Sequence, residues 1–360
     1  MIFKYLELAK NSKRMARYVT ERLRYATPYK LSNLLLTEFM FFRKKKYLSS
    51  YPFEAIIDLN NICNLRCPLC ATGRGLNQYR QGVMELSLFS KICGQLAPYV
   101  FNLALYNWGE IFLIKNLPDY LKVIEKHRLG VTLSSNLNAN LTDEVIEALV
   151  RYKVNSLVVS CDGVTQEVYQ KYRRNGDLSR VFHNIQRIQQ MKRRLKSCYP
   201  RLIWQFLLMK HNQMEAEKAK RTYEEVGADE IEFALINLPF GMDEENLATE
   251  FFVEEEWRNR ESYIISRSDL HAPCWFLWRA ITINWDGTVA PCCYVNCNDY
   301  GLGDFKTQSL REIWNSHRFV ASRGLFRRET TELDLICRQC PIYTMKVKRA
   351  KGGHSSRSFN

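Results

Sequence analysis

The sequence predicts an α/β fold, because short apolar runs alternate with longer helical patterns through its central part. The apolar runs are interpreted as strands and cover residues 55–60, 101–106, 131–134, 156–160, 202–209 and 230–236. The helical patterns lie between them, near residues 86–97, 117–128, 142–152, 180–195 and 213–226. Such alternation implies right-handed crossovers and a parallel sheet. Six strands are too few to close an eight-stranded barrel.

The helix expected near residue 142 has a clear start signal. Thr142 is a suitable N-cap, and Asp143 and Glu144 place negative charge in the first turn, where it interacts favourably with the helix dipole.

Residues 1–50 precede this alternation and are predicted to be helical, since their apolar residues recur at helical spacing. Pro28 and the polar pair Ser32-Asn33 divide the segment into two helices, of which the second starts near Leu34. Twelve Lys and Arg residues against three acidic residues make the segment basic.

The net charge of +14 is unevenly distributed, and a second basic run lies at residues 346–351. Three interpretations are open: a solvated basic surface, a segment on a membrane surface, or a patch for an anionic partner. Residues 34–42 are largely apolar and run into four basic residues, 43–46, which is typical of an interfacial helix. A helix packed on the main domain has the same pattern and is more common. We expect no nucleic-acid partner, because no recognisable reading motif is present.

The composition, 46% hydrophobic and 25% charged, is that of a soluble globular protein. Its twelve cysteines are clustered, and a chain of this size needs no disulfide framework. We find neither an export signal nor an apolar run of membrane-spanning length, and we expect a cytoplasmic protein with reduced thiols.

Three of the cysteines form the central motif of the chain. Cys63, Cys67 and Cys70 have C-x₃-C-x₂-C spacing and follow the first predicted strand, at the strand end where α/β folds collect ligands. Thiolates suit iron–sulfur clusters, zinc or cuprous copper. A closed site needs four protein ligands, so a cubane on these three cysteines would keep one iron open. A zinc loop, or thiols that pack or lie idle, are the alternatives.

This motif resembles the signature of radical S-adenosylmethionine (radical SAM) enzymes. The resemblance implies a partial (β/α)₆ TIM-like barrel with a [4Fe–4S] cluster whose open iron is chelated by SAM. An electron, supplied by a reductase or by a flavodoxin- or ferredoxin-type donor, would then cleave SAM to methionine and a 5′-deoxyadenosyl radical. That radical abstracts hydrogen from an unactivated C–H bond.

The resemblance also implies contacts to SAM from the loops after the second and third strands. Gly109 and Glu110 look like the family's glycine-and-glutamate motif, in which backbone and carboxylate meet the amino group of SAM. A glycine allows close backbone approach. Ser135 and Asn136 occupy the place where relatives hold the ribose or the carboxylate of the cofactor.

The loop after the fourth strand carries two further candidates, Ser160 and Arg173, and an arginine fork matches a carboxylate bidentately. Arg174 competes with Arg173 for this role. Cys161 stands where relatives have a small apolar residue, so it is either a buried hydrophobe, the commonest fate of a free cysteine, or a catalytic hydrogen donor.

A second set of cysteines forms a C-terminal module, as C-x₁₇-C-x₄₄-C-x₂-C. An alternating hairpin with an Asp-Gly turn follows the first of them, and a helix is expected around residues 309–322. Four such thiolates suggest a zinc ribbon or a cubane cluster. The arrangement resembles the shortened SPASM, or twitch, domain, which implies one auxiliary [4Fe–4S] cluster, with Cys293 or Cys297 as substitute ligands. The expected ligands are Cys274, Cys292, Cys337 and Cys340.

The sequence therefore predicts five segments: a basic helical extension, a radical SAM core, a linker, an auxiliary cluster domain and a basic tail. Their expected bounds are 1–50, 51–237, 238–270, 271–345 and 346–360. The leading hypothesis is oxidation or epimerisation of a small molecule, such as a sugar or another natural product. The alternatives are modification of a peptide or protein, and a non-catalytic iron–sulfur or zinc scaffold.

Overall fold

The structure is a computed structural model that describes residues 19–75, 80–235, 250–251, 273–295, 300–340 and 343. Most of the expected linker, the basic tail and Cys297 lie outside these residues. In the described chain, no helix combines the length and the apolar character that crossing a bilayer requires.

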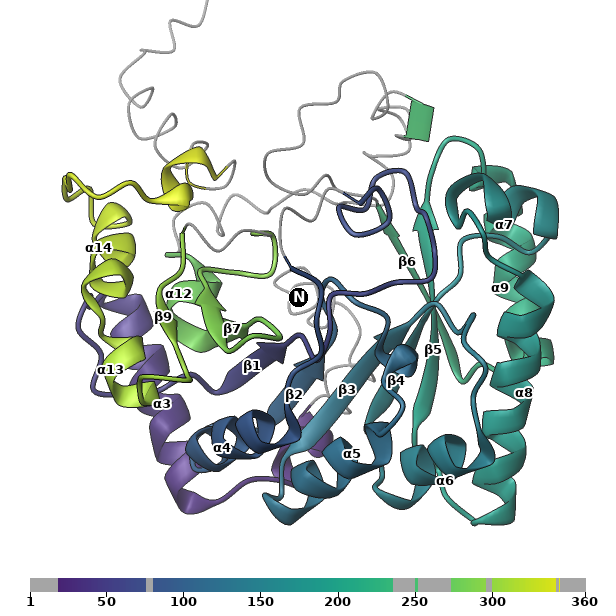
Figure 1. The fold of residues 1–360 in the computed structure, drawn as a ribbon, viewed down its shortest axis with the longest axis horizontal. Helices are drawn as coiled ribbons and strands as arrows, with labels where there is room; N and C mark the ends of the chain where they lie inside the picture. Colours follow the sequence, from purple (N-terminus) through teal and green to yellow (C-terminus); the bar gives the residue numbers. More distant parts are fainter. Residues whose placement is uncertain are drawn as a thin grey trace, which may run out of the picture.

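The α/β fold class is confirmed: a mostly parallel sheet curves through the molecule without closing (Figure 1). The strand order is β6-β5-β4-β3-β2-β1-β7-β8-β9, and the pairs from β6 to β7 are parallel. The six expected strands are all present and differ from their predicted bounds by three residues at most. They are β1 Glu54–Ile57, β2 Asn102–Leu105, β3 Gly130–Ser135, β4 Ser156–Ser160, β5 Arg201–Leu208 and β6 Glu230–Leu235.

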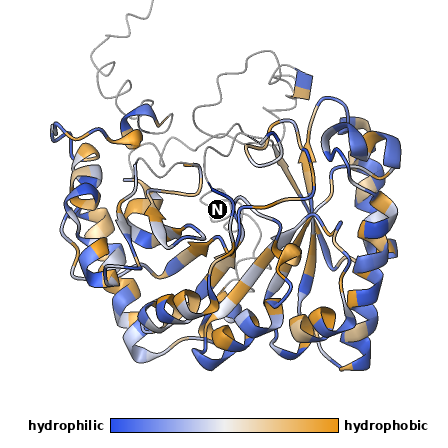
Figure 2. Cartoon of the chain, in the orientation of Figure 1, coloured by the Kyte–Doolittle hydropathy of each residue, from blue (hydrophilic) through white to orange (hydrophobic). Residues whose placement is uncertain are grey.

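Helices follow each of the strands β1 to β5 and cover the outer face of the sheet (Figure 1). The Thr142 hydroxyl caps α6 as predicted and accepts a hydrogen bond from the Val145 amide at 3.3 Å. The solvent side of α8, the longest helix among the described residues, is largely hydrophilic (Figure 2). The elements are α4 Leu86–Leu96, η1 Ile111–Leu113, α5 Leu117–Lys126, α6 Asp143–Arg151, α7 Gln166–Tyr172, α8 Leu178–Arg194, η2 Gln213–Glu215 and α9 Ala216–Val226.

The two faces of the sheet differ in polarity, because successive side chains along a strand point to opposite sides. On the helix-covered side, residues such as Leu157, Val159 and Trp204 are fully buried in the main core. Ser160 and Gln205 alternate with them and are only half-buried. A parallel sheet covered on both faces would be apolar on both, so the polar inner face marks the concave side as the place for a ligand.

The C-terminal hairpin is joined to the sheet of the core. Strand β7 (Ala280–Ile283) pairs in parallel with β1, with Ala55 opposite Ile281. Strands β8 (Thr288–Ala290) and β9 (Gly303–Asp304) then extend the sheet in antiparallel pairs. The C-terminal residues therefore continue the sheet of the core.

The helix expected around residues 309–322 is two helices, α13 (Leu310–Trp314) and α14 (His317–Leu325). Ser309 forms a capping box with Glu312 at the start of α13. The Ser316 side chain caps α14 by accepting from the Phe319 amide, and this second N-cap interrupts the helical pattern. A short α12 (Trp275–Arg279) and η3 (Ile336–Gln339) complete this region.

The helical segment is interrupted just before Pro28, as predicted, but the expected start of the second helix near Leu34, after Ser32-Asn33, was wrong. One helix, α3 (Pro28–Phe42), runs through both residues, with Thr27 as its N-cap and Pro28 in its first turn. Proline is compatible with that position because the amide it lacks would have no helical partner there. Asn33 is satisfied by Tyr51, whose backbone amide and carbonyl bond its side chain at 2.8 and 3.0 Å.

The chain after α3 is hydrogen-bonded to the C-terminal helices. The indole nitrogens of Trp278 and Trp314 donate to the carbonyls of Lys45 and Ser50 at 2.8 and 3.0 Å. The Asn315 side chain bonds both backbone groups of Leu48, at 3.0 and 2.8 Å. The N-terminal segment thus ties the C-terminal module to the edge of the core.

Lys30 on α3 predicts a pH dependence of stability. Its side chain is buried, with Nζ 5.8 Å from the centroid of the Phe101 ring. Burial, assisted by the charge of Arg128, lowers the pKa of Lys30 from 10.5 to about 8. Because the folded pKa lies below the unfolded one, the charged lysine destabilises the fold fully below pH 8, and this penalty disappears as pH rises to 10.5.

We expect Lys30→Met to raise the free energy of unfolding by about 1–2 kcal/mol at neutral pH, after allowance for solvent screening. The gain should shrink as pH rises from about 8 to about 10.5, which urea unfolding at neutral and alkaline pH would measure. The exposed Lys45→Met is the control and should change little. A gain that is equal at both pH values would contradict this account.

Candidate active site

The loops after β1, β2, β3 and β4 meet at the carboxyl edge of the sheet, around the loop that carries the three central cysteines. Cys63, Cys67 and Cys70 share one apolar cluster with Leu65, Leu69, Tyr172, Met209 and Phe251. Burial raises the pKa of Cys63 to about 11 and that of Cys67 to about 12. A metal that binds here must therefore displace thiol protons.

Gly109 allows the β2 loop to lie directly on the cysteine loop. A Cβ at this position would stand 1.7 Å from Oδ1 of Asn60 and 2.2 Å from its carbonyl oxygen, so any other residue would push the two loops apart. The side-chain amide of Asn60 donates to the Glu110 carbonyl at 2.9 Å, and the backbone amide of Glu110 donates to the Ile62 carbonyl at 2.8 Å.

The Glu110 carboxylate is buried and forms hydrogen bonds with the end of β3. It accepts from the Ser135 hydroxyl at 2.6 Å, from the Asn136 amide at 2.8 Å and from the Phe112 amide at 3.1 Å. Burial raises its pKa, and these donors oppose the shift. The geometry gives Glu110 a positioning role, while the expected contact with an amino group stays a prediction.

Asn136 connects this network to the cysteines. Its side-chain amide lies 3.7 Å from the Cys63 sulfur and 3.0 Å from Oδ1 of Asn64. The neighbouring Ser135 hydroxyl donates to Glu110 and accepts a hydrogen bond from the Leu137 amide at 2.8 Å. Of the two residues expected after β3, Asn136 is thus the one that touches the cysteine loop.

Arg173 reaches the same loop from the other side. Its Nε bonds the fully buried Asp162 carboxylate at 2.5 Å, and its Nη1 lies 3.9 Å from the Cys67 sulfur. Burial acts to lower the pKa of Arg173, but the negative charges of Asp162 and Cys67 outweigh it and raise that pKa.

The competing Arg174 has an exposed side chain. Its backbone carbonyl accepts from the Arg66 amide at 3.1 Å, and this bond holds the two loops together. The geometry therefore favours Arg173 as the arginine that faces the site.

Ser160 lies on the concave face of the sheet, in one row with Gln205 and Glu232. The strand register pairs Ser160 with Gln205, and Gln205 with Glu232. All three are half-buried and can form hydrogen bonds with a ligand. Gln205 and Glu232 were missed at the level of sequence, although single polar residues within the apolar runs of β5 and β6 were a usable signal.

Two more residues were missed, Asp162 and Gly73. Asp162 was part of a recognised Asp-Gly pair, but its ion pair with Arg173 depends on the tertiary structure. A Cβ on Gly73 would come within 2.6 Å of the Cys67 amide nitrogen. A glycine three residues after the last cysteine of the motif was the available signal.

Cys161 points away from this site. Its side chain is fully buried in the main core between sheet and helices, and its thiol donates to the Gly163 carbonyl at 3.5 Å. The geometry favours the buried-hydrophobe alternative for this residue.

The second set of thiols gathers beside the concave face. Burial raises the pKa of Cys292, and repulsion from Cys293, Cys274 and Cys337 adds to the shift. The pKa of Cys337 is raised by burial and then by Cys274 and Cys340. Cys274, Cys292 and Cys337 therefore lie near one another, and Cys340 lies near Cys337.

Cys293 lies beside these thiols and also near Tyr106. Burial raises the pKa of Tyr106 at the end of β2, and the nearby Cys293 and Glu232 raise it further. Cys293 therefore lies between the auxiliary thiols and the mouth of the concave face. The expected role of Cys293 as a substitute ligand stays a prediction.

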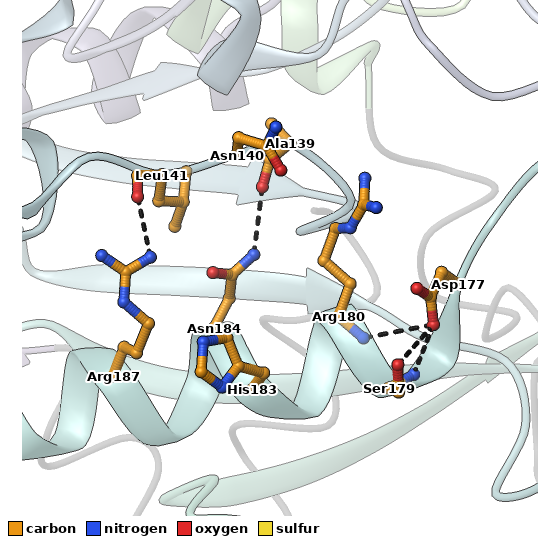
Figure 3. A pocket seen from close by; sticks show the side chains of 9 residues that line it. All are labelled: Ala139, Asn140, Leu141, Asp177, Ser179, Arg180, His183, Asn184 and Arg187. Atoms are coloured by element: carbon orange, nitrogen blue, oxygen red, sulfur yellow. Dashed lines mark hydrogen bonds between the residues drawn. The ribbon is translucent and has the colours of Figure 1, made fainter.

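A pocket of about 340 Å³ lies apart from the two groups of cysteines, between the loop after β3 and the first turns of α8 (Figure 3). Asn184 and Arg187 reach from α8 to carbonyls of that loop. The Asn138 carbonyl separates the pocket from the cysteine loop, since it accepts from Arg180 on one side and from Asn64 on the other, both at 3.3 Å.

The donor set around the central cysteines fits an iron–sulfur cluster. Thiolates are soft ligands, and N–H groups of Leu65, Asn136 and Arg173 lie 3.5, 3.7 and 3.9 Å from sulfur atoms of Cys63 and Cys67. Such donors orient thiolates and tune a bound cluster. Within the described residues, no three His, Cys, Asp or Glu side chains form a site for a single metal ion.

Comparison with protein families gave two matches. Residues 57–200 match the model of the radical SAM superfamily, and residues 274–341 match that of SPASM, an iron–sulfur cluster-binding domain.

Individual relatives are distant. GTP 3′,8-cyclase of Clostridium botulinum is 20% identical over 132 residues, which are 36% of this chain and 41% of the relative. The match therefore spans about two fifths of the cyclase's length. The tungsten-containing aldehyde ferredoxin oxidoreductase cofactor-modifying protein of Pyrococcus furiosus is 21% identical over 73% of this chain and 81% of its own.

Among solved structures, SuiB of Streptococcus suis bound to S-adenosylmethionine is similar with a TM-score of 0.62 at 14% identity. The similarity covers 84% of this chain and 73% of SuiB. At this identity the comparison shows a common fold.

The Asp162–Arg173 pair predicts a large loss of stability in Asp162→Ala. The variant would leave a buried guanidinium without its carboxylate, which costs about 3–5 kcal/mol in such pairs. The control is Asp143→Ala, since Asp143 bonds Arg187 at 2.6 Å with its own side chain 81% exposed, and exposed pairs contribute at most about 1 kcal/mol. Denaturant unfolding measures both, and equal losses would contradict the assignment.

Proposed function

This chain belongs to the radical SAM family and carries a SPASM domain, and on that premise we propose that it is a radical SAM enzyme acting on a small polar molecule. The observation that carries the proposal is the convergence of three loop cysteines with Asn136 and the Asp162–Arg173 pair at one edge of the sheet.

In this proposal Cys63, Cys67 and Cys70 hold a [4Fe–4S] cluster that also binds SAM. When bound, these groups supply the one-electron reductive cleavage of SAM that leads to hydrogen abstraction from a C–H bond. The protein positions them and excludes water, which is what a protein contributes to radical chemistry.

Arg173 is proposed to bind the SAM carboxylate. One side of its guanidinium is held by Asp162, so its orientation is fixed, and its Nη1 already lies beside Cys67. Asn136 supports the other side of the cysteine loop. Gly109, Glu110, Ser135 and Ser160 complete the proposed cofactor site.

Cys274, Cys292, Cys337 and Cys340 are proposed to hold one auxiliary [4Fe–4S] cluster. Four protein thiolates leave no iron open to substrate, so its proposed role is electron transfer to or from a substrate radical. The proximity of these thiols to one another and of Cys293 to Tyr106 supports this arrangement.

The polar concave face supports a hydrophilic small-molecule substrate. Thr132, Ser134, Gln205 and Glu232 are half-buried there and offer hydroxyl, amide and carboxylate groups to a substrate such as a sugar. Oxidation or epimerisation at a carbinol C–H is the proposed reaction. Peptide modification is the second candidate, because the similar fold of SuiB has also been solved bound to a precursor peptide.

The reconstituted protein should cleave SAM to 5′-deoxyadenosine under anoxic conditions with dithionite. Cys67→Ala should abolish this cleavage, because only two of the three cluster thiols remain. The control is Cys198→Ala, whose thiol is exposed, and it should retain the activity. Cleavage that survives Cys67→Ala would rule out the proposed cluster site.

Deuterium-labelled sugars and peptides then distinguish the substrate classes. Transfer of deuterium into 5′-deoxyadenosine from a sugar supports the proposal. Transfer from a peptide alone would replace it with peptide modification.

Replacing Arg173 should weaken SAM binding far more than replacing Arg174. A hydrogen bond to a charged group contributes about 1.5–3 kcal/mol, so Arg173→Ala should raise the Kd for SAM by roughly ten- to a hundredfold. Arg174→Ala should leave it within about twofold, because its side chain is exposed. Equilibrium binding to the reconstituted protein measures both, and the reverse order would assign the contact to Arg174.

A further inference from the structure

Helix α3 exposes several large apolar side chains to solvent, unlike an ordinary surface helix. The residues at positions 31, 35, 39 and 42, spaced to share one side of a helix, are leucine or phenylalanine and face solvent. Leu35, Phe39 and Phe42 are 71, 57 and 70% exposed. Tyr29 and Leu36 extend this outward stripe at its edges and are also exposed. Large contiguous apolar surfaces on a protein mark interaction sites.

Three polar residues of α3, Asn33, Thr37 and Glu38, face inward and have defined partners. Thr37 is fully buried and donates to the Asn33 carbonyl at 2.8 Å. Asn33 bonds the Tyr51 backbone, and the only acid of the helix, Glu38, pairs with Arg279. Because the inward contacts are specific, the helix cannot rotate to hide its apolar stripe without breaking them.

Positive charge lies at the C-terminal end of the stripe. Arg43 and Lys45 directly follow the helix and are exposed. The Arg327 guanidinium donates to the Lys44 carbonyl at 3.1 Å, which brings the end of α14 and the exposed Arg328 next to them. The nearby Glu329 is engaged by Lys46 and Arg327 at 2.8 and 3.0 Å, so the rim remains cationic.

We propose that this face, the stripe of α3 with its basic rim, docks on the surface of an anionic phospholipid bilayer. Helix α3 would lie in the plane of the interface, with leucine and phenylalanine among the acyl chains and the arginines and lysines at the phosphates. An apolar, aromatic stripe beside a basic cluster matches such a surface in both polarity and charge. A second copy of this chain would carry the same positive rim and be repelled by it.

The test is flotation of the full-length reconstituted protein with vesicles under anoxic conditions. We expect recovery with vesicles that mix phosphatidylcholine and phosphatidylglycerol, weak recovery with phosphatidylcholine alone, and release by high salt, since the basic rim acts through charge. The double variant Leu35→Glu/Phe39→Glu should lose vesicle binding by at least about tenfold while it keeps its circular dichroism spectrum and SAM cleavage. Met214→Glu is the matched control, because Met214 is 87% exposed on η2.

Equal flotation of the double variant and the wild type would overturn the proposal, as would failure of the wild type to bind anionic vesicles. Light scattering gives an independent check of the alternative occupant. A dimer that the double variant converts to monomer, without vesicle binding by the wild type, would assign the face to protein–protein contact instead.

Discussion

The Glu110 carboxylate is the interaction on which the site depends. It is buried, and its three hydrogen bonds come from its own loop and from the end of β3. Removing such a group would leave two amides and a hydroxyl unsatisfied in the interior, which costs more than the bonds contribute in net terms. Because Gly109 presses the same loop against Asn60, one carboxylate fixes the positions of three loops at once. This arrangement in turn positions the loop that carries Cys63, Cys67 and Cys70.

Much of the fold could be predicted from the sequence, since buried strands are continuous apolar runs and their helices carry regular periodicity. The convergence of the cysteine motif with the polar residues after β2, β3 and β4 could also be predicted, because the carboxyl ends of parallel strands lie at the same edge of a sheet. The structure also selects between alternatives that the sequence left open. It favours Arg173 over Arg174 for the site and assigns Cys161 to the core.

What could not be predicted are pairings between residues far apart in sequence. The partnership of Asp162 with Arg173 was missed because an Asp-Gly pair reads equally well as a turn. The inward orientation of Asn33 was missed because a polar pair next to an apolar run resembles a helix boundary. The tertiary bonds to Tyr51, not local propensity, decide that α3 continues.

The pairing of β7 with β1 has a consequence for how the chain folds. Ala55 and Ile281 lie opposite each other in this ladder, although most of the sequence separates them. Until the C-terminal third leaves the ribosome, β1 has one unsatisfied edge, and such edges invite pairing with other chains. Completion of the sheet is therefore a late, slow, long-range event. Nascent chains of this protein would depend on protection by chaperones until synthesis ends.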